Sequence, residues 1–398
     1  MARLKEYNGY YCESEYEYAF IGFLETEGWI YSSGNNISRV TKRDVLIADD
    51  FKKFIVDTNP DLTEDEVTQI FDNVRLVGSE SDFATLHKVY GWMVNGIQFT
   101  PQDGIARMIP LIDFKKDSNK NIFRVVNQFT VEYTNNGQKE NRRPDVLLFV
   151  NGMPLCVIEL KNPADANATI YDAWEQINIR YWRDIPHLLH YCTLACISDG
   201  VKTRLGTVHT PYEHFYAWRR VNDGDAVYTL PFEETETMIK GVYAPERFLE
   251  IFRDYIYFQD SIYDSDEVEI VCRYPQFFAA RLLRQSIINS VVQKSGKGGT
   301  YFGATGFGKT YTMAFLARQL ALRCTDIPEI GSPTIILIVD RDELQKQGAK
   351  LFTKSKEFLN LGEVAVVKKQ STVKTGTWRK AKWRLLHLHN SEVLRPGR

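Results

Sequence analysis

Two carboxylates and one lysine in the first half of the chain have the residue types and the spacing of a metal-dependent phosphodiester hydrolase. Asp145 follows a polar segment, and Glu159 and Lys161 lie in a later apolar run, separated only by Leu160. Hydrolysis needs a metal that polarises the phosphate and lowers the pKa of the attacking water. Mg²⁺ prefers carboxylate oxygens and keeps several waters, so Asp145 and Glu159 suffice as anchors. The Lys161 ammonium would orient or deprotonate the water and offset phosphate charge.

The geometry of these residues depends on one turn. PDVLLFV and MPLCVIELK flank Asn151-Gly152, and two apolar runs around an Asn-Gly pair predict a β-hairpin. A strict two-residue turn would place Asp145 opposite Ile158 and put the two carboxylates on opposite faces. We therefore expect a β-bulge or a three-residue turn, either of which brings Asp145 opposite Glu159.

The pattern alone is weak, because an Asp followed by a Glu-x-Lys is expected about once by chance in a chain of this size. The alternative is a surface strand on which Glu159 and Lys161 form a solvated pair. The strongly apolar run around them argues against this alternative, since charges are costly there without a purpose.

A second motif, GATGFGKT, fits the G-x4-G-K-T pattern of an ATP-binding loop. Its glycines permit the backbone to aim successive N–H groups at phosphates. Lys309 would reach the β- and γ-phosphates, and Thr310 would ligate Mg²⁺. The helix expected to follow directs its positive end at the anion. The residues expected to bind ATP in this loop are Gly303, Thr305, Gly306, Gly308, Lys309 and Thr310.

The elements that position these motifs follow from hydrophobic patterning. Residues 14–31 and 61–95 show helical spacing, with a stop expected at Gly28, and residues 121–133 predict one strand followed by a polar loop over 134–143. In order along the rest of the chain we expect an amphipathic helix from Ala168, a buried strand from His190, a helix from Arg273 and a strand within 333–347. Strands wrapped by helices predict an α/β fold.

Length and composition set outer limits. A chain of 398 residues predicts two or three domains, and a net charge of -2 gives no whole-chain argument for nucleic acid. We divide it into 1–205, a connecting region 206–265, and 266–398. The six cysteines lack zinc-ligand spacing and are expected to be buried thiols. No stretch approaches a membrane span, and we expect a cytoplasmic protein.

Several stretches resemble a known family. NQFTVEY, RRPDVLLFVNGMPLCVIELKNP and DAWEQINIRYWRDIPHL resemble the endonuclease domain of type I restriction enzyme motor (R) subunits, which belongs to the PD-(D/E)xK nuclease class. Pro144-Asp145 and Glu159-Leu160-Lys161 match the defining motif. The resemblance implies that Asp145 and Glu159 hold Mg²⁺ with the Leu160 carbonyl, and that Lys161 positions or activates the water.

The same resemblance suggests supporting residues. The family carries a glutamine and a tyrosine four apart on the next helix, whereas here Gln176 is followed by Tyr181, five positions later. Gln128 is a candidate for approaching DNA, with a buried amide at a strand end as the alternative. Arg142 and Arg143 are candidates for phosphate contacts, with solvated surface arginines as the alternative.

A third resemblance concerns the ATP-binding part. RYPQ resembles the adenine-reading glutamine motif of superfamily 2 helicases, with Gln276 as the reader, and VDRDELQKQ resembles the strand-end segment that follows in R subunits. This implies a partial first RecA-like P-loop lobe in 266–398, truncated before the Walker B acidic pair. The last stretch, from Thr377, lacks the apolar patterning expected of further strands.

Together these expectations describe a Mg²⁺-dependent DNA endonuclease domain of an ATP-dependent type I restriction enzyme R subunit. Such an enzyme is a type I site-specific deoxyribonuclease that cuts unmodified double-stranded DNA, with Mg²⁺ and ATP as cofactors. The implied partners are DNA and the methyltransferase (M) and specificity (S) subunits, and translocation by this chain alone is not expected. The alternatives are a P-loop ATP-binding protein whose hairpin is structural, and an inactive truncated remnant or assembly module.

Overall fold

The computed structural model describes most of the chain up to residue 331 and short segments beyond it. The described residues are 13–78, 80–115, 120–162, 169–227, 233–259, 267–324, 326–331, 333, 335–339, 358, 364–367 and 385–389. The chain divides into two compact units, Met1–Arg253 and Asp254–Arg398, and each is described by itself. The boundaries expected at residues 205 and 265 stay predictions.

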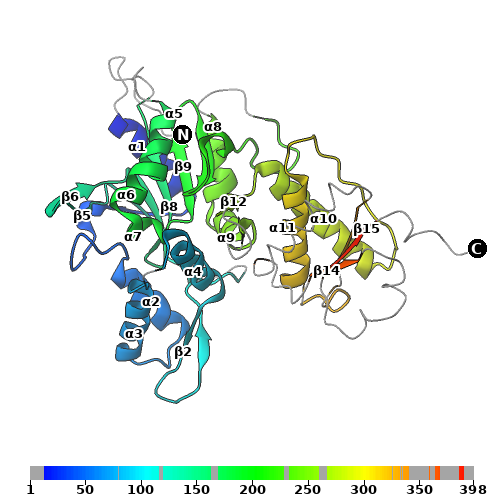
Figure 1. Cartoon of the computed structure of the whole chain (residues 1–398), viewed down its shortest axis with the longest axis horizontal. Coiled ribbons are helices and arrows are strands. Elements are labelled where there is room, and N and C mark those ends of the chain that lie inside the picture. Colours follow the sequence, from blue (N-terminus) through cyan, green and yellow to red (C-terminus); the bar gives the residue numbers. More distant parts are fainter. Residues whose placement is uncertain are drawn as a thin grey trace, which may run out of the picture. The chain divides into compact units, whose positions relative to one another are not determined.

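The centre of the first unit is a six-stranded sheet (Figure 1). Its strand order is β1 (Ile30–Ser33), β4 (Phe123–Asn127), β7 (Val146–Val150), β8 (Met153–Leu160), β9 (Leu194–Ser198) and β10 (Thr203–Thr207). The pairs β1–β4 and β8–β9 are parallel, and the other three pairs are antiparallel. Every residue of β7, β8 and β9 is buried, which is the pattern of strands covered on both faces.

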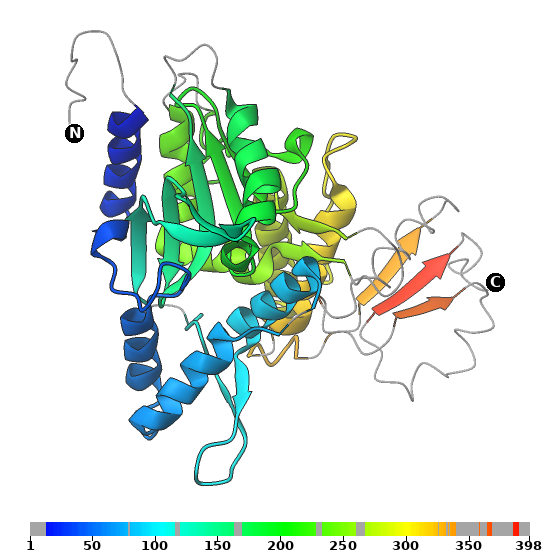
Figure 2. The same cartoon turned by 60° about the vertical axis from the view of Figure 1, so that its left-hand side comes forward.

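Helices cover this sheet, as Figure 2 shows for α1 (Glu13–Thr26) beside the strands. Both α1 and α5 (Ile170–Glu175) contact β8, and α8 (Glu233–Met238) contacts β10. The helix expected to stop at Gly28 ends at Thr26, and Gly28 has a φ of 104°. After α5 the chain continues through a π-helix, η2 (Gln176–Tyr181), and then α6 (Trp182–Asp184) and α7 (Pro186–Leu189).

A second group of helices lies below the sheet in the view of Figure 1. It consists of α2 (Ala48–Thr58), α3 (Glu64–Arg75) and α4 (Asp82–Asn95), followed by the hairpin of β2 (Ile97–Phe99) and β3 (Arg107–Ile109). The helical pattern over 61–95 is thus confirmed as two helices, of which α3 starts with a capping box of Thr63 and Glu66. The remaining short elements of this unit are η1 (Gly34–Asn36), η3 (Tyr212–His214), η4 (Ile239–Tyr243) and α9 (Pro245–Asp254).

Two expectations for residues 121–143 are wrong. The single strand is broken at Gln128, whose φ is 54°, into β4 and β5 (Val131–Asn135). The polar loop is instead β6 (Gln138–Arg142), which pairs with β5 in a separate antiparallel hairpin. Its turn, Asn136-Gly137, has positive φ at both residues. Because β6 is mostly exposed, its residues show no apolar alternation, and composition alone suggested a loop.

The second unit carries two long helices and a short parallel sheet. The helices are α10 (Tyr274–Val292) and α11 (Lys309–Leu322), and a small hairpin joins β11 (Ile256–Phe258) to β12 (Glu269–Val271). The parallel sheet has the order β13 (Ile335–Val339), β15 (Leu385–His389), β14 (Val364–Val367). The expectation of no further strand after Thr377 is wrong, because β15 lies in the middle of this sheet. Its five residues are too few to stand out from the basic segment around them. Residues 340–347, the rest of the segment in which this strand was expected, lie outside the described residues.

Five of the six cysteines are described, and all five are buried and unpaired, as expected: Cys156, Cys192, Cys196, Cys272 and Cys324. Burial raises the pKa of Cys196 to about 12 and that of Cys156 well above its usual value. Cys12 lies outside the described residues. Within the described part of the chain, no helix has both the length and the apolar character needed to cross a membrane.

Candidate functional site

The hairpin of β7 and β8 contains the expected irregularity. Val150 pairs with Met153 across a two-residue turn, but the register shifts between Leu148 and Phe149, so that Val146 pairs with Ile158. The expected β-bulge is therefore confirmed, and Leu155 is the additional residue. Continued by one residue, the shifted register sets the position before Val146 opposite the position after Ile158, which are Asp145 and Glu159.

The two carboxylates lie close together and are largely shielded from solvent. The backbone N–H of Leu160 donates to Asp145 Oδ2 over 2.9 Å, which holds this carboxylate against β8. The Glu159 side chain is fully buried. Burial, and then repulsion by Asp145, raise the pKa of Glu159 well above its ordinary value, although Lys161 and Tyr181 act in the opposite direction. A cation between the two carboxylates would offset this repulsion.

Glu159 is hydrogen-bonded to Gln176 and Tyr181, and Gln176 connects it to Lys161. Lys161 Nζ donates to Gln176 Oε1 over 3.0 Å, and Gln176 Nε2 donates to Glu159 Oε2 over 2.7 Å. Tyr181 Oη donates to Glu159 Oε1 over 2.6 Å and accepts from Gln176 Nε2 over 2.8 Å. The structure therefore brings both helix residues to the carboxylate that the motif predicts.

The π-helix explains the five-residue spacing of Gln176 and Tyr181. In an α-helix, residues four apart share a face, whereas a π-helix brings together residues five apart. Gln176 and Tyr181 are the first and last residues of η2. The additional residue relative to the family pattern is thus absorbed by the helix, and the tyrosine still reaches Glu159.

The available donors suit a hard cation. Asp145, Glu159 and the backbone carbonyl of Leu160 would all present oxygen, which is what Mg²⁺ accepts alongside several waters. Among the residues that the structure describes, no group of three or more His, Cys, Asp or Glu side chains is arranged to hold a metal. The oxygen donors of this site fit a cation that keeps much of its hydration.

Gln128 lies beside this site but is turned toward the protein. Its side-chain amide donates to Glu17 Oε2 over 2.7 Å, and its backbone N–H donates to the Asp145 carbonyl oxygen over 3.0 Å. Glu17, on α1, was missed by sequence reasoning, because a single glutamate in a helix of mixed pattern carries no recognisable signal. An approach of Gln128 to DNA stays a prediction.

The two arginines expected near phosphates have different environments. Arg142 pairs with Asp184, with Nη2–Oδ2 at 2.6 Å, and lies over the ring of Tyr133 at 5.4 Å. Arg143 is exposed, and no polar partner for its side chain is found within the described segments. Phosphate contacts by either residue stay predictions.

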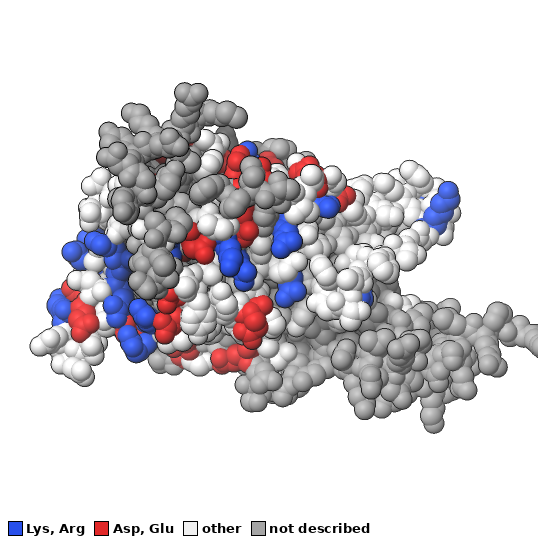
Figure 3. Space-filling view, turned by 90° about the horizontal axis from the view of Figure 1, so that it is seen from above, with Lys and Arg blue, Asp and Glu red and all other residues white. Residues whose placement is uncertain are grey.

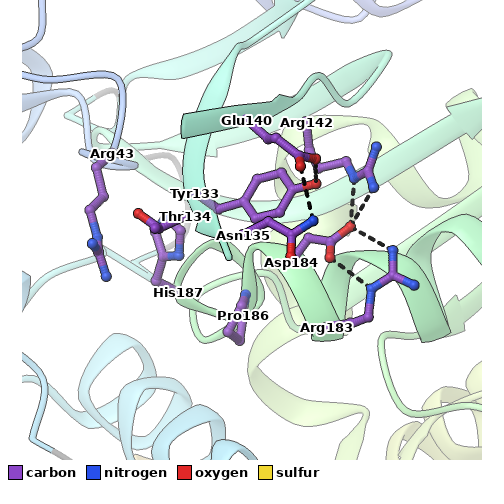
Figure 4. A pocket seen from close by; sticks show the side chains of 10 residues that line it. All are labelled: Arg43, Tyr133, Thr134, Asn135, Glu140, Arg142, Arg183, Asp184, Pro186 and His187. Atoms are coloured by element: carbon purple, nitrogen blue, oxygen red, sulfur yellow. Dashed lines mark hydrogen bonds and ion pairs between the residues drawn. The ribbon is translucent and has the colours of Figure 1, made fainter. Parts of the chain in front are cut away.

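Arg142 also lines a pocket of about 610 Å³ (Figure 4). Asp184 binds Arg142 and Arg183 there, and hydrogen bonds from these arginines, led by Arg183, lower the pKa of Asp184. Figure 3 shows Lys and Arg side chains gathering on the side of the first unit where Figure 1 places β5 and β6. The pocket is lined by Arg43, Tyr133, Thr134, Asn135, Glu140, Arg142, Arg183, Asp184, Pro186 and His187.

The expected ATP-binding loop leads directly into α11, which begins at Lys309. Gly306 and Gly308 have positive φ angles of 84° and 69°, which glycine adopts without strain. Lys309 Nζ donates to the carbonyl oxygens of Gly303 and Ala304, at 2.8 and 3.1 Å. These observations are compatible with a phosphate-binding loop, and the binding of ATP by these residues stays a prediction.

Gln276 is brought to the same loop. It is buried, its Oε1 accepts from the Arg273 backbone N–H over 2.8 Å, and its Nε2 donates to the carbonyls of Phe307 and Gly308. The structure therefore unites two segments that are about thirty residues apart in the sequence. For Thr305 and Thr310 it gives only their places, in the loop and in the first turn of α11.

Comparison with known protein families identifies the first unit. A family model described as "Type I restriction enzyme R protein N terminus" matches residues 10–214, which is 205 of the 398 residues. The chain belongs to this family. A second model, of the SWI2/SNF2 ATPase, matches residues 275–381 of the chain and supports a helicase-like lobe there. The mixed α/β architecture of both units agrees with these matches.

Curated relatives extend the match across most of the chain. It is 28% identical over 366 residues to a putative type I restriction enzyme MjaIXP endonuclease subunit of Methanocaldococcus jannaschii, covering 85% of this chain and 34% of that protein. It is also 28% identical over 364 residues to the type I restriction enzyme HindI endonuclease subunit of Haemophilus influenzae, covering 87% and 33%. The chain therefore spans about one third of the length of these relatives.

Proposed function

We propose that the first unit is a Mg²⁺-dependent DNA endonuclease of the PD-(D/E)xK class. One observation carries this proposal: Asp145, held by the Leu160 N–H, lies beside Glu159, and Gln176 joins Glu159 to Lys161 by hydrogen bonds. A surface strand with a solvated Glu–Lys pair would not bury Glu159 completely. A carboxylate whose pKa is raised by burial and then by a second carboxylate is typical of a functional site.

Each side chain has a defined task in this proposal. Asp145, Glu159 and the Leu160 carbonyl would hold Mg²⁺, which polarises the phosphate and acidifies water when it is bound. Gln176 holds the Lys161 ammonium at the site, where it orients the attacking water and offsets phosphate charge. Burial and Glu159 raise the pKa of Tyr181 well above its ordinary value, so the phenol remains a hydrogen-bond donor that fixes Glu159.

The substrate and partners follow from the family. The curated relatives are named as endonuclease subunits of type I restriction enzymes. We propose that this chain cuts unmodified double-stranded DNA as part of such an enzyme, with methyltransferase and specificity subunits as partners. Sequence recognition would then come from the specificity subunit.

We further propose that the second unit binds ATP with Mg²⁺. The glycines with positive φ, the position of Lys309 and the contact of Gln276 with the loop support this role. Thr310 would ligate the Mg²⁺ of the nucleotide, and Gln276 would recognise the adenine. An ATP-binding protein without nuclease activity is the second candidate, because this loop is complete independently of the carboxylates.

Nicking of supercoiled plasmid by the purified chain with Mg²⁺ and without ATP tests the nuclease proposal. We expect nicking by the wild type and none by Asp145→Ala, because the metal loses a ligand. Lys161→Ala should bind the metal but nick about 10² to 10⁴ times more slowly, as for loss of a proton-transfer group. Equal nicking by wild type and Asp145→Ala would disprove this site. A folded wild type that binds ATP and never nicks would favour the second candidate.

A further inference from the structure

The chain leaves β4 through a residue in an uncommon backbone conformation. Gln128 has a φ of 54°, in the left-handed region that residues other than glycine seldom adopt. Its backbone N–H donates to the carbonyl oxygen of Asp145 over 3.0 Å. This hydrogen bond extends the pairing of β4 with β7, in which Asn127 lies opposite Val146, by one residue. A displacement of Gln128 would therefore displace the backbone of Asp145.

Glu17 holds this conformation from α1. Its side chain is only 4% exposed, and its two carboxylate oxygens accept from Asn127 Nδ2 over 2.6 Å and from Gln128 Nε2 over 2.7 Å. Asn127 is fixed from its other side by Tyr31, whose hydroxyl donates to Oδ1 over 3.1 Å. The buried carboxylate of Glu17 thus binds the side-chain amides of two consecutive residues at the strand break.

Gly34 restrains the same backbone by close approach. A Cβ at this position would lie 2.7 Å from the Asn127 carbonyl oxygen and from Phe129 Cα, and 2.8 Å from the Gln128 carbonyl oxygen. The strand break is therefore fixed by a side chain on one element and by a glycine on another. Strained residues persist only where the surroundings hold them firmly, and they gather at functional sites.

We propose that Glu17 is a positioning residue for Asp145, acting through Gln128. This proposal rests on the nuclease function proposed above. The carboxylate of Glu17 fixes the Gln128 side chain, the left-handed backbone of Gln128 presents its N–H to Asp145, and Asp145 is held where its carboxylate meets Glu159. Residues that orient metal ligands in this way typically change metal affinity or activity by about 10- to 100-fold when they are lost.

The test compares Glu17→Gln with wild type in the 398-residue chain. Glutamine keeps the size of the side chain but replaces one acceptor oxygen with an NH₂ group, which must face an amide donor of Asn127 or Gln128. One of the two ties is therefore lost. Glu25→Gln is the matched control, because Glu25 is exposed on the same helix and the substitution removes the same charge.

Two titrations report on the metal site. Tb³⁺, a hard cation that takes oxygen ligands as Ca²⁺ and Mg²⁺ do, is followed by luminescence excited through tyrosine, with Asp145→Ala defining the specific signal. Mg²⁺ is followed by the rate of plasmid nicking. For Glu17→Gln we expect half-saturation by both ions at about tenfold higher concentration, with the nicking rate returning toward the wild-type value at high Mg²⁺. Glu25→Gln should match the wild type in both titrations.

The outcomes distinguish the positioning role of Glu17 from the nuclease function on which it rests. If Glu17→Gln is folded and both half-saturating concentrations are unchanged, the positioning role is wrong and Glu17 serves stability alone. If that variant does not fold, Gln128→Gly replaces it, because glycine keeps the positive φ without strain and removes only the amide tie. The same shift is then expected, and its absence overturns the role. A wild type without Asp145-dependent Tb³⁺ binding would instead overturn the metal nuclease itself.

Discussion

Among the single residues, Glu159 has the environment that most constrains the chemistry. It is fully buried, it faces Asp145, and its pKa is raised, first by burial and then by that second carboxylate. An unfolded chain releases this proton near pH 4.3, whereas the folded chain retains it to higher pH. The free energy of unfolding of the metal-free protein therefore falls as pH rises above about 4.3. In the proposed function, Mg²⁺ would replace this proton and would stabilise the folded chain.

This predicts that Mg²⁺ binding releases protons at any pH below the raised pKa of Glu159, because the bound form needs this carboxyl ionised. Calorimetric titration in buffers of different ionisation enthalpy measures the number released. Affinity for Mg²⁺ should rise with pH until the Glu159 carboxyl is ionised in the metal-free state. A binding enthalpy that is the same in every buffer would show that Glu159 is already ionised without metal.

At the scale of elements, the π-helix η2 lets both Gln176 and Tyr181 contact Glu159, although they are five residues apart rather than four. Gln176 and Tyr181 meet across five positions, and both bind Glu159. π-helical turns are rare and are found frequently at functional sites. Ile179, inside η2, is 47% exposed, so the additional residue contributes little to the core.

Deletion of Ile179 should therefore be tolerated. The shortened segment would form an ordinary α-helical turn in which glutamine and tyrosine are four apart and still share a face. We expect plasmid nicking to remain close to wild type, whereas Tyr181→Phe, which removes the hydroxyl that binds Glu159, should slow it. Loss of nicking by a folded deletion variant would show that the π-helical geometry itself is required.

The same scale shows how much of the fold could be predicted from sequence. The bulge in β8 follows from the alternation of strand side chains once Asp145 and Glu159 are required to meet, and the structure has it. The β5–β6 hairpin did not follow, although Asn136-Gly137 marks its turn, because its exposed strands lack an apolar face.

The candidate site was predictable only in part, for physical reasons. Asp145, Glu159 and Lys161 lie close in sequence and carry a local motif. Glu17 contributes from α1, 111 positions before Gln128, through hydrogen bonds that leave no local pattern. The π-helix was also hidden, since one additional residue in an amphipathic segment does not change its composition.

At the scale of the whole molecule, each proposed activity lies within one compact unit. The carboxylates, Lys161 and the Gln176–Tyr181 pair belong to the first unit. The nucleotide loop and Gln276 belong to the second, whose core includes Tyr255 packed on Phe277 and Phe315 at 4.8 and 5.5 Å between ring centroids. Each site therefore has its own supporting core.

Lys309→Ala should consequently abolish nucleotide binding and leave ATP-free nicking unchanged. The Lys309 ammonium donates hydrogen bonds to the loop carbonyls of its own unit, and its loss removes the charge that would face the β- and γ-phosphates. Fluorescence anisotropy with a labelled ATP analogue and plasmid nicking measure the two properties. Lys297→Ala, an exposed change in the same unit, is the control, and reduced nicking by Lys309→Ala alone would reveal coupling between the units.

The bulge at Leu155 determines which side chains of β7 and β8 point to the same face of the hairpin. Because side chains alternate between faces, Asp145 and Glu159 can meet only if an odd number of residues between them, turn included, is unpaired. Here the unpaired residues are the two of the turn and Leu155, and a three-residue turn with an unbroken β8 would also leave three. Evolution can therefore exchange the bulge for a longer turn. A single insertion or deletion between the two carboxylates, by contrast, would place them on opposite faces of the hairpin.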